Sequence, residues 1–226
     1  MSIMKTPIIV VNFKAYEKST GWNAEVLSKL CEKISFETGK TIVVAVQEAD
    51  IYRVATEVKI PVFAQHIDPV EFGAHTGSIL AEDVKENGAV GTLLNHAERR
   101  ISPEVIEKSI RRAKEVGLIT IVCAPTPELA EKIASFNPDF IAIEPPELIG
   151  GDVSVSTAEP EIITGTIKKV HSVAKIPVLC GAGIKNKNDV ERAIRLGAKG
   201  ILLASGVTKS DNPEKVLREL VNGLNG

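Results

Sequence analysis

The segment Phe140-Ile141-Ala142-Ile143-Glu144-Pro145-Pro146 contains an apolar run, a carboxylate and two prolines in succession. Its apolar start, with two isoleucines, is typical of a buried strand. The strand is expected to end at Glu144, because the two prolines fix their φ angles and cannot extend a sheet. Gly150 and Gly151 then restore backbone freedom. A lone acid in this setting indicates either a surface glutamate before a turn or a general base beneath a closing lid.

The same order, an apolar run and then an amphipathic segment, occurs eight times along the chain. Strands are expected at residues 8–13, 41–46, 61–65, 89–94, 118–123, 139–143, 177–180 and 200–203. Helices are expected at residues 22–36, 51–58, 80–86, 103–116, 127–136, 159–173, 188–196 and 213–224. The helix at 103–116 has the clearest boundaries, since Ser102 is a natural N-cap, Pro103 suits the first position and Gly117 suits the C-cap.

Eight βα units with nearly continuous Val, Ile and Leu strands predict a parallel sheet whose outer face is covered by helices. Closure into a single (β/α)8 barrel, with eight parallel strands spanning residues 1–226, is favoured because a closed sheet leaves no exposed edge. A doubly wound open sheet is the alternative. No linker, change of composition or low-complexity stretch indicates a second domain.

Composition excludes several classes of function. The chain has 226 residues, of which 44% are hydrophobic and 25% charged, and a net charge of −2. Lys and Arg form no long block, so nucleic acid is not an expected partner. No apolar run approaches the ~20 residues of a membrane span, and the first residues do not resemble a signal peptide. We therefore expect a cytoplasmic protein without a membrane partner.

The cysteines and histidines do not predict a metal site. Cys31, Cys123 and Cys180 are odd in number and widely spaced, and two of them end apolar runs, which favours buried free thiols over disulfides or ligands. His96 and Glu98 could ligate a metal together, but no second His or Cys cluster has ligand spacing.

Polar residues gather where the expected strands end, which is where the reactive groups of such a barrel lie. Asn12 and Lys14 follow the first strand, His96 and Glu98 the fourth, and Glu144 the sixth. Taken singly, Lys14 is also consistent with a solvated lysine and His96 with a structural histidine. If these strand ends meet at one rim, Lys14 is instead a compact cation suited to an anionic substrate.

Small residues follow the last two strands, at Gly181-Ala182-Gly183 and Ala204-Ser205-Gly206. Two tight turns would explain them. A dinucleotide fingerprint is weakly supported, since position 186 is Asn rather than Gly. The loops after strands seven and eight are the usual phosphate site of such barrels, so these residues favour main-chain N–H groups that contact a phosphate.

Five motifs, taken in order along the chain, resemble one family. They are Asn12-Phe13-Lys14, Asn95-His96-Ala97-Glu98-Arg99, Glu144-Pro145-Pro146-Glu147-Leu148-Ile149-Gly150, Cys180-Gly181-Ala182-Gly183-Ile184 and Leu202-Leu203-Ala204-Ser205-Gly206. The set resembles triosephosphate isomerases of the short archaeal type, which are TIM barrels.

The resemblance implies an isomerase of glycolysis and gluconeogenesis that interconverts dihydroxyacetone phosphate and D-glyceraldehyde 3-phosphate through an enediolate, without a cofactor. It implies that Glu144 is the base and that His96 is the electrophile. A turn at residues 96–99, together with burial near a positive helix end, would keep the imidazole neutral. Lys14 and Asn12 match the residues that anchor the substrate, and Glu98 matches the carboxylate beside the lysine. The positions that match phosphate contacts are Ile149, Gly150, Gly183, Ala204 and Ser205.

The 65–79 loop resembles the family's third loop, which reaches into a neighbouring subunit, so a homodimer or homotetramer is implied. Two departures stand out: Ala97 replaces a serine usual in the family, and Gly151-Asp152 replaces Thr-Gly. Without the serine hydroxyl at position 97, a contact that would hold the Glu144 carboxylate in the open state is absent, which concerns the resting position of the base and not its identity. Two alternatives remain. One is another phosphate-binding barrel, such as an isomerase or lyase of amino-acid biosynthesis, and the other is a non-catalytic barrel used as a binding module.

Overall fold

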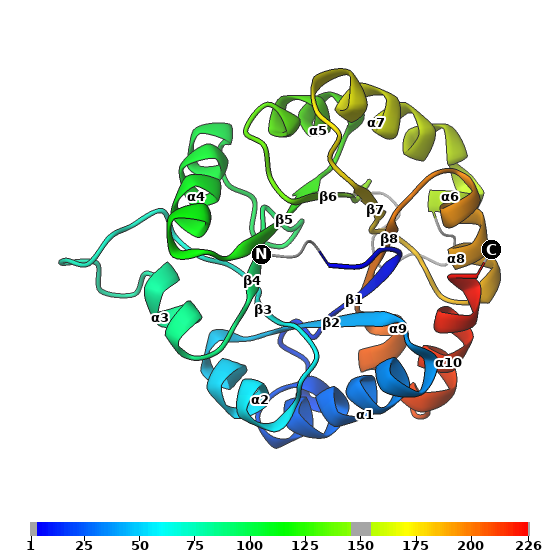
Figure 1. The fold of residues 1–226 in the computed structure, drawn as a ribbon, viewed down its shortest axis with the longest axis horizontal. Helices are drawn as coiled ribbons and strands as arrows, with labels where there is room; N and C mark the ends of the chain where they lie inside the picture. Colours follow the sequence, from blue (N-terminus) through cyan, green and yellow to red (C-terminus); the bar gives the residue numbers. More distant parts are fainter. Residues whose placement is uncertain (1–3, 146–154, 226) are drawn as a thin grey trace.

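The computed structural model describes residues 4–145 and 155–225. Eight parallel strands close into a barrel in which each strand pairs with the next and β8 pairs with β1 (Figure 1). The strands are β1 (Ile8–Asn12), β2 (Thr41–Val46), β3 (Val62–Ala64), β4 (Gly91–Leu94), β5 (Ile119–Ala124), β6 (Phe140–Ile143), β7 (Val178–Cys180) and β8 (Gly200–Leu203). The predicted (β/α)8 barrel is confirmed, and the open sheet is excluded.

Helices surround the strands on the outside of the barrel (Figure 1). They are α1 (Trp22–Thr38), α2 (Ile51–Glu57), α3 (Ala81–Glu86), α4 (Pro103–Val116), α5 (Pro127–Ala134), α6 (Val155–Ala158), α7 (Pro160–Val173), α8 (Lys187–Arg195), α9 (Ser205–Thr208) and α10 (Pro213–Gly223), with 3-10 turns η1 (Glu17–Ser19) and η2 (Glu48–Asp50). The sequence did not predict η1, η2, α6 or α9, because three or four residues are too few to show helical periodicity.

The capping residues act as the sequence indicates. Ser102 adopts an extended conformation and its hydroxyl accepts a hydrogen bond from Val105 N at 3.4 Å, while Gly117 ends α4 at φ 75°. An unpredicted cap begins α8, where Asn186 and Asp189 each accept a hydrogen bond from the other's backbone N–H. These caps fix where each helix starts after its strand, and so fix the length of the βα loops.

Alternation along the strands divides the apolar residues between two cores. In β1, Ile8 and Val10 point into the barrel, where Phe63 and Phe140 also pack, whereas Ile9 and Val11 pack against the helices. All of these side chains are fully buried. The barrel interior is therefore a packed apolar core, and a substrate can bind only at one of its ends.

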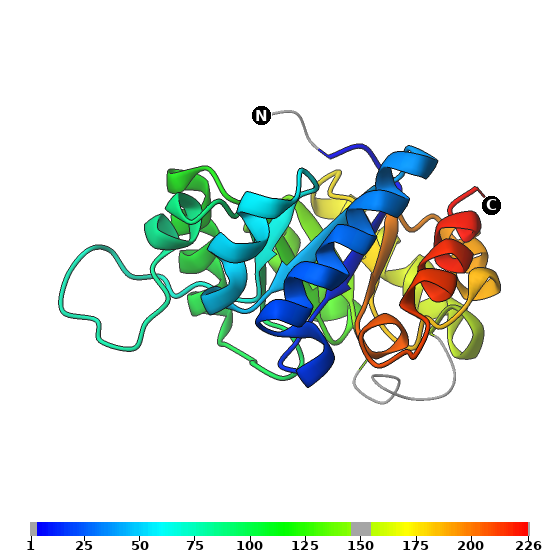
Figure 2. The same ribbon diagram turned by 90° about the horizontal axis from the view of Figure 1, so that it is seen from below.

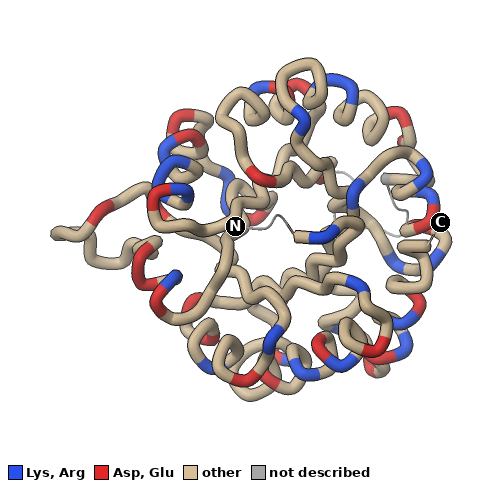
Figure 3. The backbone as a smooth tube through the Cα atoms, viewed as in Figure 1, with Lys and Arg blue, Asp and Glu red and all other residues tan. Residues whose placement is uncertain are grey.

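The charged residues of the described chain lie mostly on the outer helices and loops, as the blue and red segments of the backbone tube show (Figure 3). Several ion pairs join neighbouring helices: Lys29 to Glu57 at 2.8 Å, Arg218 to Glu37 at 2.7 Å and Lys169 to Glu131 at 3.0 Å. Because these pairs are exposed, each contributes little stability. Among the described residues, no helix has both the length and the apolar character needed to cross a membrane.

The carboxyl ends of all eight strands face the same end of the barrel, since the strands are parallel. Figure 2 shows this end at the bottom, where α9 lies and from which α1 runs upward beside the barrel. The loops that follow the strands meet here, and with them the polar residues that the sequence places after β1, β4 and β6.

Candidate active site

A pocket opens at this end of the barrel and brings together residues that are far apart in the sequence. Its lining includes Asn12, Lys14, His96 and Glu144, together with Gly181, Gly183, Ala204 and Ser205. Glu98 lies at its edge, ion-paired to Lys14. The structure therefore gathers seven of the ten predicted site residues around one pocket, together with Gly181, and Glu98 lies beside it. Ile149, Gly150 and the Gly151-Asp152 departure lie outside the described residues.

Glu144 is held at the end of β6 with its carboxylate buried. Its backbone N–H donates to Ala124 O at 2.8 Å, continuing the ladder between β6 and β5, and the residue is 2% exposed. Among the described residues, none forms a hydrogen bond with Oε2. Burial raises the pKa of this carboxyl to about 7, an effect partly offset by the Cys123 thiol and by the charges of Arg100 and Lys14. A carboxylate in this setting is a strong base for its type.

His96 faces Glu144 from the neighbouring side of the pocket, with Nε2 3.7 Å from Glu144 Oε1. Its other ring nitrogen, Nδ1, accepts a hydrogen bond from the backbone N–H of Glu98 at 3.1 Å. An N–H donor at Nδ1 requires an unprotonated nitrogen there, so the proton of the neutral ring is assigned to Nε2. Burial, with the positive charge of Lys14 second, lowers the pKa of His96 to about 4. The imidazole is therefore neutral at neutral pH.

The expected turn at residues 96–99 exists, because Arg99 N donates to His96 O at 2.8 Å. It presents the Glu98 N–H to the imidazole and so supplies the positive end of a peptide dipole. The sequence suggests that a turn of this kind, with burial, would keep His96 neutral, and the structure has both the turn and the buried imidazole.

Lys14 follows β1 in a strained backbone conformation, with φ at 51°. Two hydrogen bonds support it: its N–H donates to Asn12 Oδ1 at 3.0 Å, and Gln65 Nε2 donates to its carbonyl at 3.0 Å. The ammonium pairs with Glu98 at 2.9 Å. Strain held in place by neighbours in this way is typical of functional positions. The structure thus aims a fixed cation into the pocket.

The other end of the pocket is lined by small residues from the loops after β7 and β8. Gly183 has φ 68°, a conformation that glycine adopts at little cost. Ala204 is the N-cap of α9, and Ser205 is its first residue. Three residues that the sequence analysis missed, Tyr16, Lys185 and Lys209, also line the pocket. Lys209 Nζ lies 4.5 Å from the centre of the Tyr16 ring. The arrangement offers main-chain groups and cations to an anion.

Comparison with known proteins identifies the family. A family model described as triosephosphate isomerase matches residues 7–223. The triosephosphate isomerase of Methanobacterium bryantii is 52% identical over 98% of this chain and 99% of its own length. That of Methanothermus fervidus is 48% identical over 98% of this chain and 100% of its own length. The chain belongs to the triosephosphate isomerase family.

Solved structures agree on the fold. A triosephosphate isomerase from Bartonella henselae superimposes with a TM-score of 0.73 over 98% of both chains, at 21% sequence identity. At this identity the likeness supports the barrel alone. Membership of the triosephosphate isomerase family excludes the amino-acid-biosynthesis barrel considered from the sequence.

Several features that this triosephosphate isomerase family member uses around its pocket were not predicted from the sequence. Gln65 was noted only as part of the 65–79 loop, yet its amide contacts the carbonyls of Lys14 and Ala45. All three cysteines are free and buried, as expected, but the proximity of Cys123 to Glu144 was not foreseen. Within residues 4–145 and 155–225, no three His, Cys, Asp or Glu side chains gather as metal ligands would.

Replacing Gly181 by Ala is expected to lower kcat by about 10- to 100-fold while the protein stays folded. A Cβ atom at this position would lie 2.5 Å from Glu144 Cγ and 3.1 Å from Ile143 O, so the Glu144 side chain must move. A displacement of about 1 Å can cost roughly 100-fold in rate. Steady-state kinetics and circular dichroism test this. Gly165→Ala, where the added Cβ meets nothing within 4 Å, is the control. Unchanged kinetics in Gly181→Ala would show that the pocket tolerates a shifted carboxylate.

Proposed function

We propose that Glu144 and His96 together carry out the proton transfer of this enzyme. As a member of its family, the chain is an isomerase that interconverts dihydroxyacetone phosphate and D-glyceraldehyde 3-phosphate through an enediolate, a step of glycolysis. The observation that carries the proposal is the 3.7 Å separation of His96 Nε2 and Glu144 Oε1. A three-carbon substrate in the pocket lies within reach of both groups.

The reaction removes a proton from a carbon beside a carbonyl and returns it to the neighbouring carbon. Glu144 acts as the base, and its pKa of about 7 is close to neutral pH, where a general base with such a pKa is most effective. His96 donates its Nε2–H to the oxygens that become negative in the enediolate. This division of roles is the established one for the family.

Lys14 and Asn12 hold the substrate at the β1 side of the pocket. The ammonium of Lys14 stabilises the negative charge that develops on the substrate oxygen and attracts the phosphate ester. Glu98 pairs with Lys14 at 2.9 Å and gives the ammonium a defined position. No step in this scheme calls for a metal or an organic cofactor.

The phosphate group is assigned to the end of the pocket formed by Gly183, Ala204 and Ser205. Small side chains there let the phosphate oxygens approach main-chain N–H groups. Lys185 and Lys209 line the same end and add positive charge. Ile149 and Gly150, the remaining residues assigned to phosphate binding, stay predictions from the sequence.

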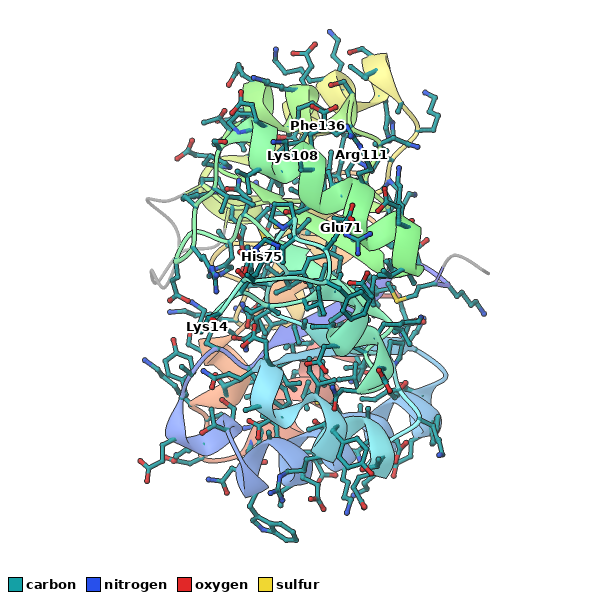
Figure 4. All side chains as sticks on the ribbon, turned by 90° about the vertical axis from the view of Figure 1, so that its left-hand side faces the viewer. Lys14, Glu71, His75, Lys108, Arg111 and Phe136 are labelled. Carbon is teal, nitrogen blue, oxygen red and sulfur yellow. The ribbon has the colours of Figure 1, made fainter. Side chains whose placement is uncertain are left out.

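The 65–79 loop supports assembly into a homodimer or homotetramer. It projects from one side of the barrel between β3 and α3 (Figures 1 and 2), and residues 71–78 are all exposed, Phe72 at 76%. Figure 4 looks onto this face and labels Glu71 and His75 of the loop. A second pocket beside Lys14, lined by Gln65, His66 and Arg99 among others, offers a place for a partner's loop. Light scattering of the purified protein measures whether it is a dimer or a tetramer. We also propose that the enzyme is cytoplasmic.

A coupled assay with D-glyceraldehyde 3-phosphate tests the proposed function and its pH dependence together. We expect turnover, with kcat/KM falling about tenfold for each unit of pH below about 7, because Glu144 must be deprotonated to accept a proton. His96, with a pKa of about 4, adds no further loss above about pH 5. A non-catalytic barrel would show no turnover, and an acid limb centred near 4 would mean that Glu144 is not the titrating base.

A further inference from the structure

Asn95 stands directly before His96 in an unusual backbone conformation. Its φ is 56°, in the left-handed region that favours glycine, and the residue is 2% exposed. Asn adopts this conformation more readily than most residues, but burying its amide costs free energy unless both ends find partners. A buried, left-handed residue beside the proposed electrophile therefore calls for a specific set of contacts.

The side-chain amide of Asn95 makes two hydrogen bonds that no other orientation would allow. Nδ2 donates to Cys123 O on β5 at 2.8 Å, and Oδ1 accepts from Ile101 N at 3.0 Å. Because one partner is a carbonyl and the other an N–H, the orientation of the amide is fixed by its partners. The backbone carbonyl of Asn95 accepts a third hydrogen bond, from Arg100 Nη1 at 3.1 Å.

These contacts close residues 95–101 into a loop fastened to β5. The loop contains His96 and also Glu98, whose N–H fixes the tautomer of His96 and whose carboxylate pairs with Lys14. On the other side, the hydrogen bond to Cys123 O reaches the residue whose thiol lies beside Glu144. The Asn95 amide thus connects the 95–101 loop, which holds His96, to β5, which lies beside Glu144.

We propose that Asn95 is a positioning residue that sets where His96 lies relative to Glu144 and keeps the His96 proton on Nε2. It does not touch the substrate. It acts by holding the 95–101 loop so that the Glu98 N–H meets Nδ1 while Nε2 faces the carboxylate. The inference rests on the proposed roles of His96 and Glu144.

The test is Asn95→Gly, which keeps the left-handed backbone accessible and removes only the amide. We expect kcat to fall about 10- to 100-fold while KM for glyceraldehyde 3-phosphate stays within about twofold, because the phosphate end of the pocket is built from β7 and β8. Nitrogen-15 NMR of the His96 ring should show that the proton is no longer confined to Nε2 and that Nδ1 is protonated in part of the molecules.

Asn137→Gly is the matched control. Asn137 has the same φ of 56° but is exposed after α5, outside the pocket. It should keep wild-type kinetics and the wild-type His96 spectrum. If the wild-type protein and this control were themselves inactive, the proposed function would fail, whereas the role of Asn95 in placing His96 would still be read from the ring spectrum.

A second variant, Asn95→Asp, keeps the size of the side chain and the acceptor for Ile101 N but removes the donor to Cys123 O. It should also lose kcat with little change in KM, and it serves if Asn95→Gly does not fold. The proposal is overturned if a folded variant keeps the wild-type kcat and His96 spectrum, or if it loses thermal stability alone.

Discussion

Replacing Glu144 by Gln is expected to lower kcat by roughly 10³–10⁴-fold and to stabilise the folded protein at about pH 8. The loss of rate follows because an amide cannot accept the substrate proton. KM should change little, since we assign the phosphate to the opposite end of the pocket. Glu144→Asp should lower kcat by about 100-fold, because its shorter side chain withdraws the carboxylate by about 1 Å.

The gain in stability follows from the sign of the Glu144 pKa shift. Burial raises this pKa from 4.5 to about 7 in the folded state. The group's favourable contribution to stability is therefore fully present below about pH 4.5 and is lost as pH rises through about 7. Above that pH the buried carboxylate, without a partner at Oε2 among the described residues, costs up to about 3 kcal/mol relative to a neutral side chain.

Thermal unfolding at two pH values separates this effect from a general change in packing. Glu144→Gln should melt above the wild type at about pH 8 and close to it at about pH 4.5. Glu144→Asp keeps the charge and should show no such gain. A Gln variant that melts below the wild type at both pH values, or that loses kcat and substrate binding equally, would contradict the role given to Glu144.

Much of this fold could be predicted because each strand repeats one physical pattern. Phe140–Ile143 is apolar on both faces, as a strand between a barrel interior and a helix layer must be, and it ends where Pro145 cannot continue a sheet. The rule that polar groups at strand ends meet at one rim then placed Glu144, His96 and Lys14 in one pocket. Local chemistry decided these features, so the sequence was sufficient.

The remaining features depend on contacts between segments that are distant in the chain. Nothing local to Gln65 indicates that its amide supports Lys14, 51 residues earlier, and nothing local to Asn95 indicates a bond to β5. The short helix α9 has four residues, too few to show a helical period in the sequence. The His96 tautomer depends on a turn whose geometry the sequence could suggest but not fix.

Replacing Lys14 by Met is expected to lower kcat/KM by roughly 1,000-fold or more, because one ammonium serves two purposes. The first, proposed above, is to bind the substrate and stabilise the developing enediolate oxygen. The second acts on His96. Burial is the largest cause of the lowered His96 pKa of about 4, and the charge of Lys14 is the second. Glu98 opposes both, because its carboxylate oxygen lies 3.6 Å from Nδ1.

Without Lys14, the Glu98 carboxylate has no ammonium partner, and the His96 pKa should rise from about 4 toward 6.5. Protonated His96 carries a hydrogen on Nδ1, which breaks its hydrogen bond from the Glu98 N–H. In mildly acidic solution the variant should therefore lose the neutral His96 proposed as electrophile, in addition to the Lys14 ammonium. Kinetics across pH, together with an NMR titration of His96, measure both losses. Lys18→Met is the control, because Lys18 is an exposed lysine of the same loop that pairs with Asp211. A Lys14→Met variant with an unmoved His96 titration would show that burial alone keeps the imidazole neutral.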